Sequence, residues 1–141
     1  DEKAPVDPRD LAQLTEVRLR YGVTLIMSSE EPALRQEGLR ELEAYVKAQP
    51  GDGRGWFQLG RLLHEEFEQH ARAAEHLERA LAIDPWCERT LKLLLTLYTI
   101  HLPNPERAAR LTNCLETNAA RRKAEIELRK KTRTDATDGC Y

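Results

Sequence analysis

The fold is decided by the stretch from residue 56 to residue 85, which reads WFQLGRLLHEEFEQHARAAEHLERALAIDP. Large apolar residues recur in it at steps of three and four, which is the spacing of one face of an α-helix. A polar run over residues 68–70 interrupts this pattern, and Asp84-Pro85 ends it because proline cannot continue a helix. The stretch therefore predicts two helices, from about Gly55 to Phe67 and from about Ala71 to Ile83, joined as a hairpin.

The same pattern continues on both sides of this stretch. Upstream, it predicts one helix from Arg9 to a break at residues 28–32 and another from there to a break at residues 49–53. Downstream, it predicts a fifth helix from about Cys87 to Ile100, and Asn104-Pro105 opens a sixth, because asparagine caps helices and proline fits the first turn. No segment alternates like a β-strand. The sequence therefore predicts an all-α fold of about six helices arranged in pairs.

A period of 34 residues links the second and third pairs, because Ala80-Leu81 and Cys114-Leu115 lie 34 residues apart and each follows a leucine by three residues. With this period, the chain resembles the tetratricopeptide-repeat family, whose pattern is W-x2-L-G-x2-Y, then A-x3-F, then P. The residues that carry the resemblance are Trp56, Leu59, Gly60, Leu63, Ala73, Leu77, Ala80 and Pro85. The resemblance implies a superhelical array of antiparallel helix pairs with a capping helix at its end.

The flanking repeats match this pattern less well. The third places Leu95 where the glycine belongs and Arg107 where the alanine belongs. The first keeps Tyr21-Gly22 and has Gly38 at the small position. Terminal repeats of such arrays often depart from the pattern because only one of their faces is covered. The resemblance therefore implies three repeats over residues 9–118, with the middle repeat as the best match.

The two ends of the chain lie outside these repeats. We expect residues 1–8 to be a flexible lead-in and residues 132–141 to be a disordered tail. Between residues 119 and 131 we expect a basic capping helix. Residues 121–133 hold seven basic and two acidic side chains, so this segment is either a soluble end cap or an arm for anionic lipid, RNA or an acidic protein.

The resemblance also implies where a partner would bind. In this family the first helices of the pairs line a concave groove that receives a peptide or a helix of another protein. Spacing from Trp56 assigns to this groove, from the middle repeat, Arg54, Phe57, Gln58, Arg61 and His64. The third repeat adds Arg89, Lys92, Thr96 and Thr99, and the first adds Glu16, Leu19, Arg20 and Val23. The expected groove is basic, which favours an acidic or C-terminal peptide, or a helix, as the ligand.

Two interpretations of the cations Arg61, Arg89 and Lys92 stay open. They form an ordinary solvated face, or they receive acidic groups of a partner beside Phe57, whose ring offers an apolar and cation-stacking surface. A subset of the family grips acidic chaperone tails with lysines, asparagines and an arginine. At the matching places this chain has Leu19, Val23, Gln58, Arg89 and Leu93, so the resemblance does not extend to that subset.

The expected function is therefore that of a protein-interaction adaptor or scaffold. The alternative is a structural subunit of a larger assembly, which would use its outer faces and the basic C-terminal helix. Leu93, Ile100 and Leu102 indicate an apolar patch that would serve such an assembly.

Several other functions are not expected. The net charge of −2 argues against nucleic acid as the main partner, and against a membrane except through the basic segment. We expect no enzyme and no cofactor, because the chain has no Gly-rich phosphate loop and its cysteines have no paired histidine. Histidines 64, 70 and 76 are spaced by six residues, which does not place them on one helix face, so we expect no metal site.

Cysteine spacing and hydropathy bear on the compartment. Cys87, Cys114 and Cys140 are odd in number and lack the Cys-x-x-Cys spacing of zinc and redox sites, which favours a reducing, intracellular compartment, cytoplasmic or organellar. The most apolar stretch, residues 91–100, is interrupted by Lys92 and Thr96, so the sequence predicts a soluble chain without a membrane span.

Overall fold

The computed structural model describes residue 5 and residues 7–132. Every element in these residues is helical, which confirms the all-α prediction. In chain order the elements are α1 (Pro8–Ser28), α2 (Pro32–Ala48), α3 (Gly53–Glu65), α4 (His70–Ile83), α5 (Glu88–Thr96), the π-helix η1 (Leu97–His101) and α6 (Pro105–Thr132). None of these helices has an apolar stretch long enough to cross a bilayer.

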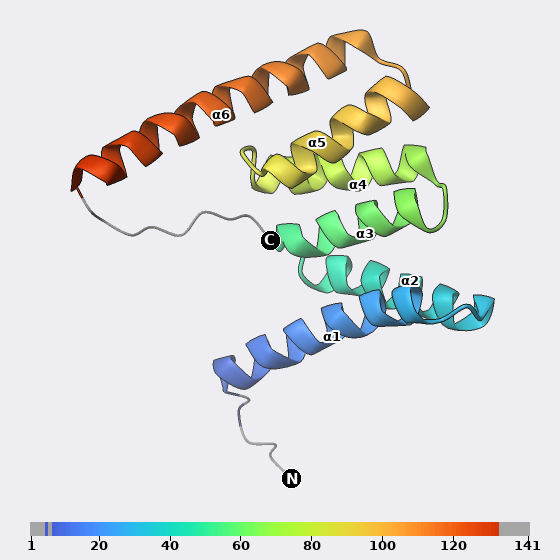
Figure 1. Ribbon diagram of the computed structural model, residues 1–141. Coiled ribbons are helices and arrows are strands. Elements are labelled where there is room, and N and C mark those ends of the chain that lie inside the picture. Colours follow the sequence, from blue (N-terminus) through green and yellow to red (C-terminus); the bar gives the residue numbers. More distant parts are fainter. Residues whose placement is uncertain (1–4, 6, 133–141) are drawn as a thin grey trace.

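Consecutive helices pack as three hairpins, α1 with α2, α3 with α4, and α5 with α6, and the hairpins stack on one another (Figure 1). One apolar core runs through the stack. Leu42 belongs to it in the first hairpin, Leu63 and Leu77 in the second, and Leu94 and Leu111 in the third. Each hairpin therefore shares its core with its neighbour, which is how such arrays gain stability.

A glycine contact is repeated in the first two hairpins. A Cβ atom on Gly60 would lie 2.7 Å from Cγ of Leu77 and 3.1 Å from the carbonyl oxygen of Ala73, across the α3–α4 crossing. A Cβ atom on Gly22 would lie 2.9 Å from Cγ of Leu42 and 3.2 Å from the carbonyl oxygen of Gly38, across the α1–α2 crossing. Glycine therefore permits the close approach of the helices at equivalent places, as the repeat register predicts.

The third hairpin is built differently. Leu95, which is half-buried, stands at the position that Gly60 occupies in the second hairpin. The helix expected over residues 87–100 is confirmed, but its last part is not α-helical, because residues 97–101 form the π-helix η1. The N–H of Leu102 closes this turn by donating to the carbonyl oxygen of Leu97 at 2.7 Å. A π-helix adds a residue to the turn and changes the direction of the following side chains.

The ends of the array also differ from expectation. Asp7 caps α1 by accepting from the N–H of Arg9 at 2.8 Å, while residues 1–4, 6 and 133–141, which include most of the expected lead-in and tail, lie outside the described residues. The expected separate capping helix over 119–131 is wrong, because α6 runs without a break from Pro105 to Thr132. Residues 119–128 are all exposed, and the helix diverges from α5 (Figure 1). Good helix formers with no glycine or proline keep it continuous.

Candidate protein-binding face

An open hollow of about 370 Å³ lies between α1 and α3, the first helices of the first two hairpins. Its lining consists of Glu16, Leu19, Arg20, Val23 and Thr24 of α1, with Arg54 and Gln58 of α3. Apart from Thr24, these are residues that spacing assigned to the groove. Sequence reasoning missed Thr24, although it follows Val23 directly. The structure thus brings the first-repeat and second-repeat groove residues together at one place.

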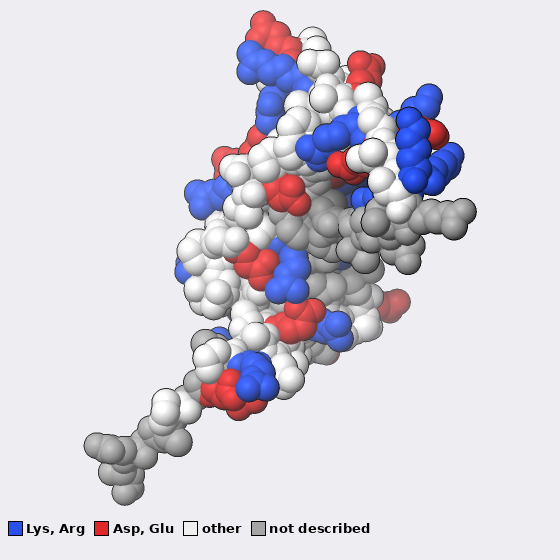
Figure 2. Space-filling view, turned by 90° about the vertical axis from the view of Figure 1, so that its left-hand side faces the viewer, with Lys and Arg blue, Asp and Glu red and all other residues white. Residues whose placement is uncertain are grey.

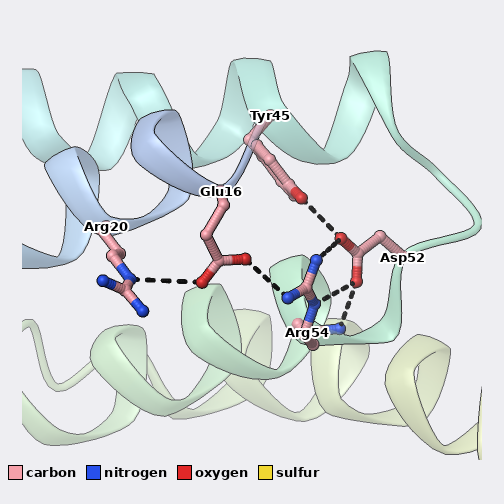
Figure 3. A network of polar contacts seen from close by, with 5 residues as sticks. All are labelled: Glu16, Arg20, Tyr45, Asp52 and Arg54. Atoms are coloured by element: carbon pink, nitrogen blue, oxygen red, sulfur yellow. Dashed lines mark hydrogen bonds and ion pairs between the residues drawn. The ribbon is translucent and has the colours of Figure 1, made fainter. Parts of the chain in front are cut away.

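Arg54 is the centre of a polar network at the edge of this hollow (Figure 3). Its Nη1 atom lies 2.6 Å from Oε2 of Glu16, and its Nη2 atom lies 3.1 Å from Oδ2 of Asp52. Asp52 also caps α3 by accepting from the backbone N–H of Arg54 at 3.0 Å, and the Tyr45 hydroxyl donates to it at 2.5 Å. The other Glu16 oxygen accepts from Nε of Arg20 at 3.2 Å. The network therefore joins α1, α2 and α3.

The protonation states in the network follow from these contacts. Burial raises the pKa of Tyr45 to about 12, and the hydrogen bond to Asp52 adds to the rise. Burial also acts to raise the pKa of Asp52, but the hydrogen bonds from Arg54 and Tyr45 outweigh it and lower that pKa overall. The hydrogen bond to Asp52 raises the pKa of Arg54. The network therefore holds the Arg54 guanidinium between the carboxylates of Glu16 and Asp52.

Arg61 and Gln58 form the next part of the α3 face. Nε and Nη2 of Arg61 donate to Oε1 of Gln58 at 3.1 and 2.7 Å, and Nη1 lies 3.0 Å from Oε2 of Glu65. The Arg61 side chain is only 19% exposed. Its charge is therefore fixed and largely compensated within α3.

Phe57 does not have the exposed position that the groove assignment requires. Its side chain is only 2% exposed and belongs to the core. The guanidinium carbon of Arg89 lies 4.7 Å from the centre of the Phe57 ring. The expectation that Phe57 offers a binding surface is wrong, because its side chain is buried and Arg89 lies over its ring.

The third-repeat groove residues lie elsewhere. Lys92 lines a second hollow, of about 620 Å³, between α5 and α6. There Glu88 pairs with Lys92 at 2.6 Å and with Arg122 of α6 at 2.5 Å, and these two partners lower its pKa. Thr96 lines neither hollow, and its exposed hydroxyl donates to the carbonyl oxygen of Lys92 at 3.0 Å. The structure therefore does not bring Lys92 and Thr96 together with Arg54.

The expected basic groove also needs a correction, because its cations are paired with carboxylates. Arg54, Arg61 and Lys92 each have a carboxylate within 3.1 Å. In the part of the surface that Figure 2 shows in colour, blue and red side chains lie beside one another at several places. Arg61 and Lys92 pair with acidic residues four positions away on their own helices, whereas Arg54 pairs with Asp52 and with Glu16 of α1.

The expected apolar patch is smaller than the sequence indicated. Ile100 is 66% exposed, but Leu93 and Leu102 are half-buried and pack against the core. Trp86 is 43% exposed and is partly covered by Arg121, whose guanidinium carbon lies 4.8 Å from the ring centre.

The histidines are grouped in a way that the sequence pattern did not predict. His64, which spacing assigned to the groove, lies at the end of α3 beside His70 and His101. His76 is not part of this group, and its ring lies 5.5 Å from that of Trp56. The periodicity argument missed the group because its members come from three different elements.

The structure describes two of the three cysteines. Cys87 is buried, and Cys114 is half-buried with a free thiol. Cys140 lies outside the described residues.

Comparisons with protein-family models, with curated proteins and with solved structures find no match to this chain.

Proposed function

We propose that the chain is a protein-interaction adaptor of tetratricopeptide-repeat type, which binds a peptide or a helix of another protein in the hollow between α1 and α3. The observation that carries the proposal is the composition of this hollow, in which the groove positions of two successive repeats converge. The face needs no chemical step, and its shape is already formed by the packed hairpins. A preformed site lowers the entropy cost of capturing a flexible peptide.

The hollow offers an apolar floor with charged sides. Leu19 and Val23 of α1 present aliphatic groups, and Leu19 is also anchored in the core. The Arg20 side chain is 78% exposed at the edge of the hollow, and that of Arg54 is 42% exposed. Such a surface suits a short segment that places one apolar side chain on the floor and one acidic group at the edge.

An acidic group of the ligand would compete with Glu16 for the two guanidinium groups. Because Glu16 pairs with both Arg20 and Arg54, an incoming carboxylate gains only the difference between the two interactions. We therefore expect modest affinity that falls as salt is added, since exposed charges are screened.

The test uses a displayed library of random peptides, selected against the full chain. We expect selected peptides enriched in Asp and Glu, and we expect Thr24→Glu to abolish the selection. Thr24 is exposed and lines the hollow, so a glutamate there narrows the hollow and repels acidic ligands.

The matched control is Val17→Glu, which places the same charge on an exposed position of α1 outside the lining. Selection by this variant should equal that of the unchanged chain, and both variants should unfold at the same temperature as that chain. If Thr24→Glu selects the same peptides as the unchanged chain, the hollow is not the binding site. If the selected peptides lack acidic residues, the charge argument is wrong.

A second candidate, a subunit of a larger assembly, is favoured by the exposed distal part of α6. Ile126 and Leu128 are 42% and 61% exposed there, and Ile126 lines the α5–α6 hollow together with Leu115 and Ala119. A helix of another subunit could cover this apolar lining. Loss of a native complex on Ile126→Arg, with peptide selection intact, would favour this candidate over the first.

A further inference from the structure

Three histidine side chains meet at one edge of the array. His64 lies in the last turn of α3, His70 begins α4, and His101 ends η1. Nδ1 of His64 and Nδ1 of His70 are 2.9 Å apart, and one ring nitrogen from each of the three histidines lies within 4.8 Å of the other two. The rings of His70 and His101 are stacked, with centres 3.9 Å apart. Few combinations of side chains in a protein offer three nitrogen ligands so close together.

Two unusual turns produce this arrangement. Between α3 and α4, Glu68 adopts a left-handed conformation with φ of 53°, and the N–H of Gln69 donates to the carbonyl oxygen of Leu63 at 2.9 Å. This turn folds His70 back beside His64. In the third hairpin, the π-helix turns His101 toward the same place. The left-handed region costs a residue other than glycine free energy, so the turn is held by its surroundings.

The spacing of the nitrogens suits a transition-metal ion. Zinc binds histidine nitrogen at about 2.0 to 2.1 Å, so two tetrahedral ligands lie about 3.3 Å apart. That value falls between the 2.9 Å separation of the two Nδ1 atoms and the 4.8 Å limit of the whole group. Small side-chain rotations would therefore bring all three nitrogens to coordination distance, and the stacked rings of His70 and His101 would have to open.

Metal binding would require the neutral form of each imidazole. A neutral imidazole has one nitrogen with a free electron pair, which is the ligand atom that a metal needs. For both Nδ1 atoms to coordinate, the hydrogen that now joins them would move to an Nε2 atom.

We propose that His64, His70 and His101 form a binding site for a divalent transition-metal ion of the zinc type. Imidazole ligands select zinc, copper or nickel ions over magnesium and calcium, which prefer oxygen. A bound ion would join α3, α4 and η1, and so fix the second hairpin to the third at this edge. The site is separate from the α1–α3 hollow and does not depend on the proposed adaptor function.

The test is a calorimetric titration of the full chain with zinc chloride, followed by titration with cobalt chloride and visible absorption. We expect one zinc ion per chain and the d–d absorption of cobalt in a nitrogen site. His101→Gln, at an exposed position, should lower the zinc association constant by at least about tenfold. The triple change of His64, His70 and His101 to glutamine should remove the binding, and magnesium chloride should give none.

His76→Gln and Cys114→Ser are the controls, because they remove a histidine and the free thiol that lie outside the group. Both should bind zinc as the unchanged chain does. Equal zinc binding by the unchanged chain and the triple variant would overturn the proposal, as would the absence of binding by the unchanged chain. Circular dichroism of each metal-free variant establishes that it is folded, and His101→Gln alone decides the question if the triple variant is not.

Discussion

The second and third hairpins show two ways to build the same supersecondary unit. In the second hairpin, α3 and α4 cross closely at Gly60, where a Cβ atom would lie 2.7 Å from Cγ of Leu77, and both helices are regular. In the third, Leu95 occupies the equivalent place, α5 ends at Thr96, and a π-helix completes it. The two hairpins thus differ in the residue at this position and in the regularity of their first helix, while both contribute to the same apolar core.

The two junctions between hairpins are more alike than the hairpins themselves. Between the first and second hairpins, Asp52 accepts a hydrogen bond from the Tyr45 hydroxyl and forms an ion pair with Arg54. Between the second and third hairpins, Glu78 forms an ion pair with Nη2 of Arg107 at 2.6 Å and accepts a hydrogen bond from the Tyr98 hydroxyl at 3.1 Å. Each junction thus combines a tyrosine hydroxyl and an arginine on one carboxylate. Charge-assisted hydrogen bonds of this kind fix orientation as well as adding stability.

The largest expected effect on stability comes from replacing Gly60 of the second hairpin by leucine, the residue at the equivalent place in the third hairpin. Gly60→Leu would place a side chain where even a Cβ atom lies 2.7 Å from Leu77, so the helices must separate. We expect a loss of about 3 kcal/mol in the free energy of unfolding, as for severe overpacking of a core. The free energy of unfolding of both chains can be measured by urea denaturation.

Gly51→Ala is the control for this change. A Cβ atom on Gly51 would meet nothing within 4 Å, and its φ is not positive. We expect a change of less than about 0.5 kcal/mol. Equal losses for the two variants would show that close approach at Gly60 does not limit the second hairpin.

A smaller effect is expected at the junction between the second and third hairpins. Glu78→Gln removes the charge that Arg107 and Tyr98 contact, and the side chains of Glu78 and Arg107 are 32% and 29% exposed. After allowing for solvent screening, we expect a loss of about 1.5 kcal/mol. Hydrogen exchange should quicken in η1 and α6 but not in α1. Glu127→Gln, in the exposed pair with Lys130, should leave both measurements unchanged.

The smallest effect is expected at the junction between the first and second hairpins, and it depends on pH. Tyr45→Phe removes the hydroxyl that donates a hydrogen bond to Asp52, which should lower the free energy of unfolding by about 1 kcal/mol near neutral pH. Because the folded pKa of Tyr45 is raised from 10.0 to about 12, the hydroxyl contributes fully below pH 10, and its contribution is lost as pH rises through 12. The difference between wild-type and variant stability should shrink over this interval. A constant difference would mean that the hydroxyl does not titrate as described.

Much of the helical organisation could be predicted from the sequence. Apolar spacing located the helices, and Gly60 and Leu77 predicted the close crossing, because these signals are local and strong. The π-helix and the unbroken α6 were not predicted, since periodicity does not separate one helix type from another and nothing in residues 118–119 marks a boundary.

The candidate sites were harder to predict because they depend on contacts between elements. Spacing placed Arg54 and Gln58 on one face of a helix, and both line the α1–α3 hollow, but it could not show that Glu16 would reach Arg54 from another helix. Spacing along α3 also could not show that Phe57 would be buried in the core. The meeting of His64 and His101, which are far apart in the chain, depends on the turns, and no helical periodicity describes it.

The continuous α6 has a mechanical consequence. At 1.5 Å per residue, Thr132 lies about 20 Å beyond Asn118, the last buried residue of the helix. Asn118 donates to the carbonyl oxygen of Trp86 at 3.0 Å, and one turn farther Arg122 pairs with Glu88. These contacts lie where the exposed part of α6 begins. A force applied to the tip of α6 would therefore be transmitted to the first turn of α5, where the third hairpin meets the second.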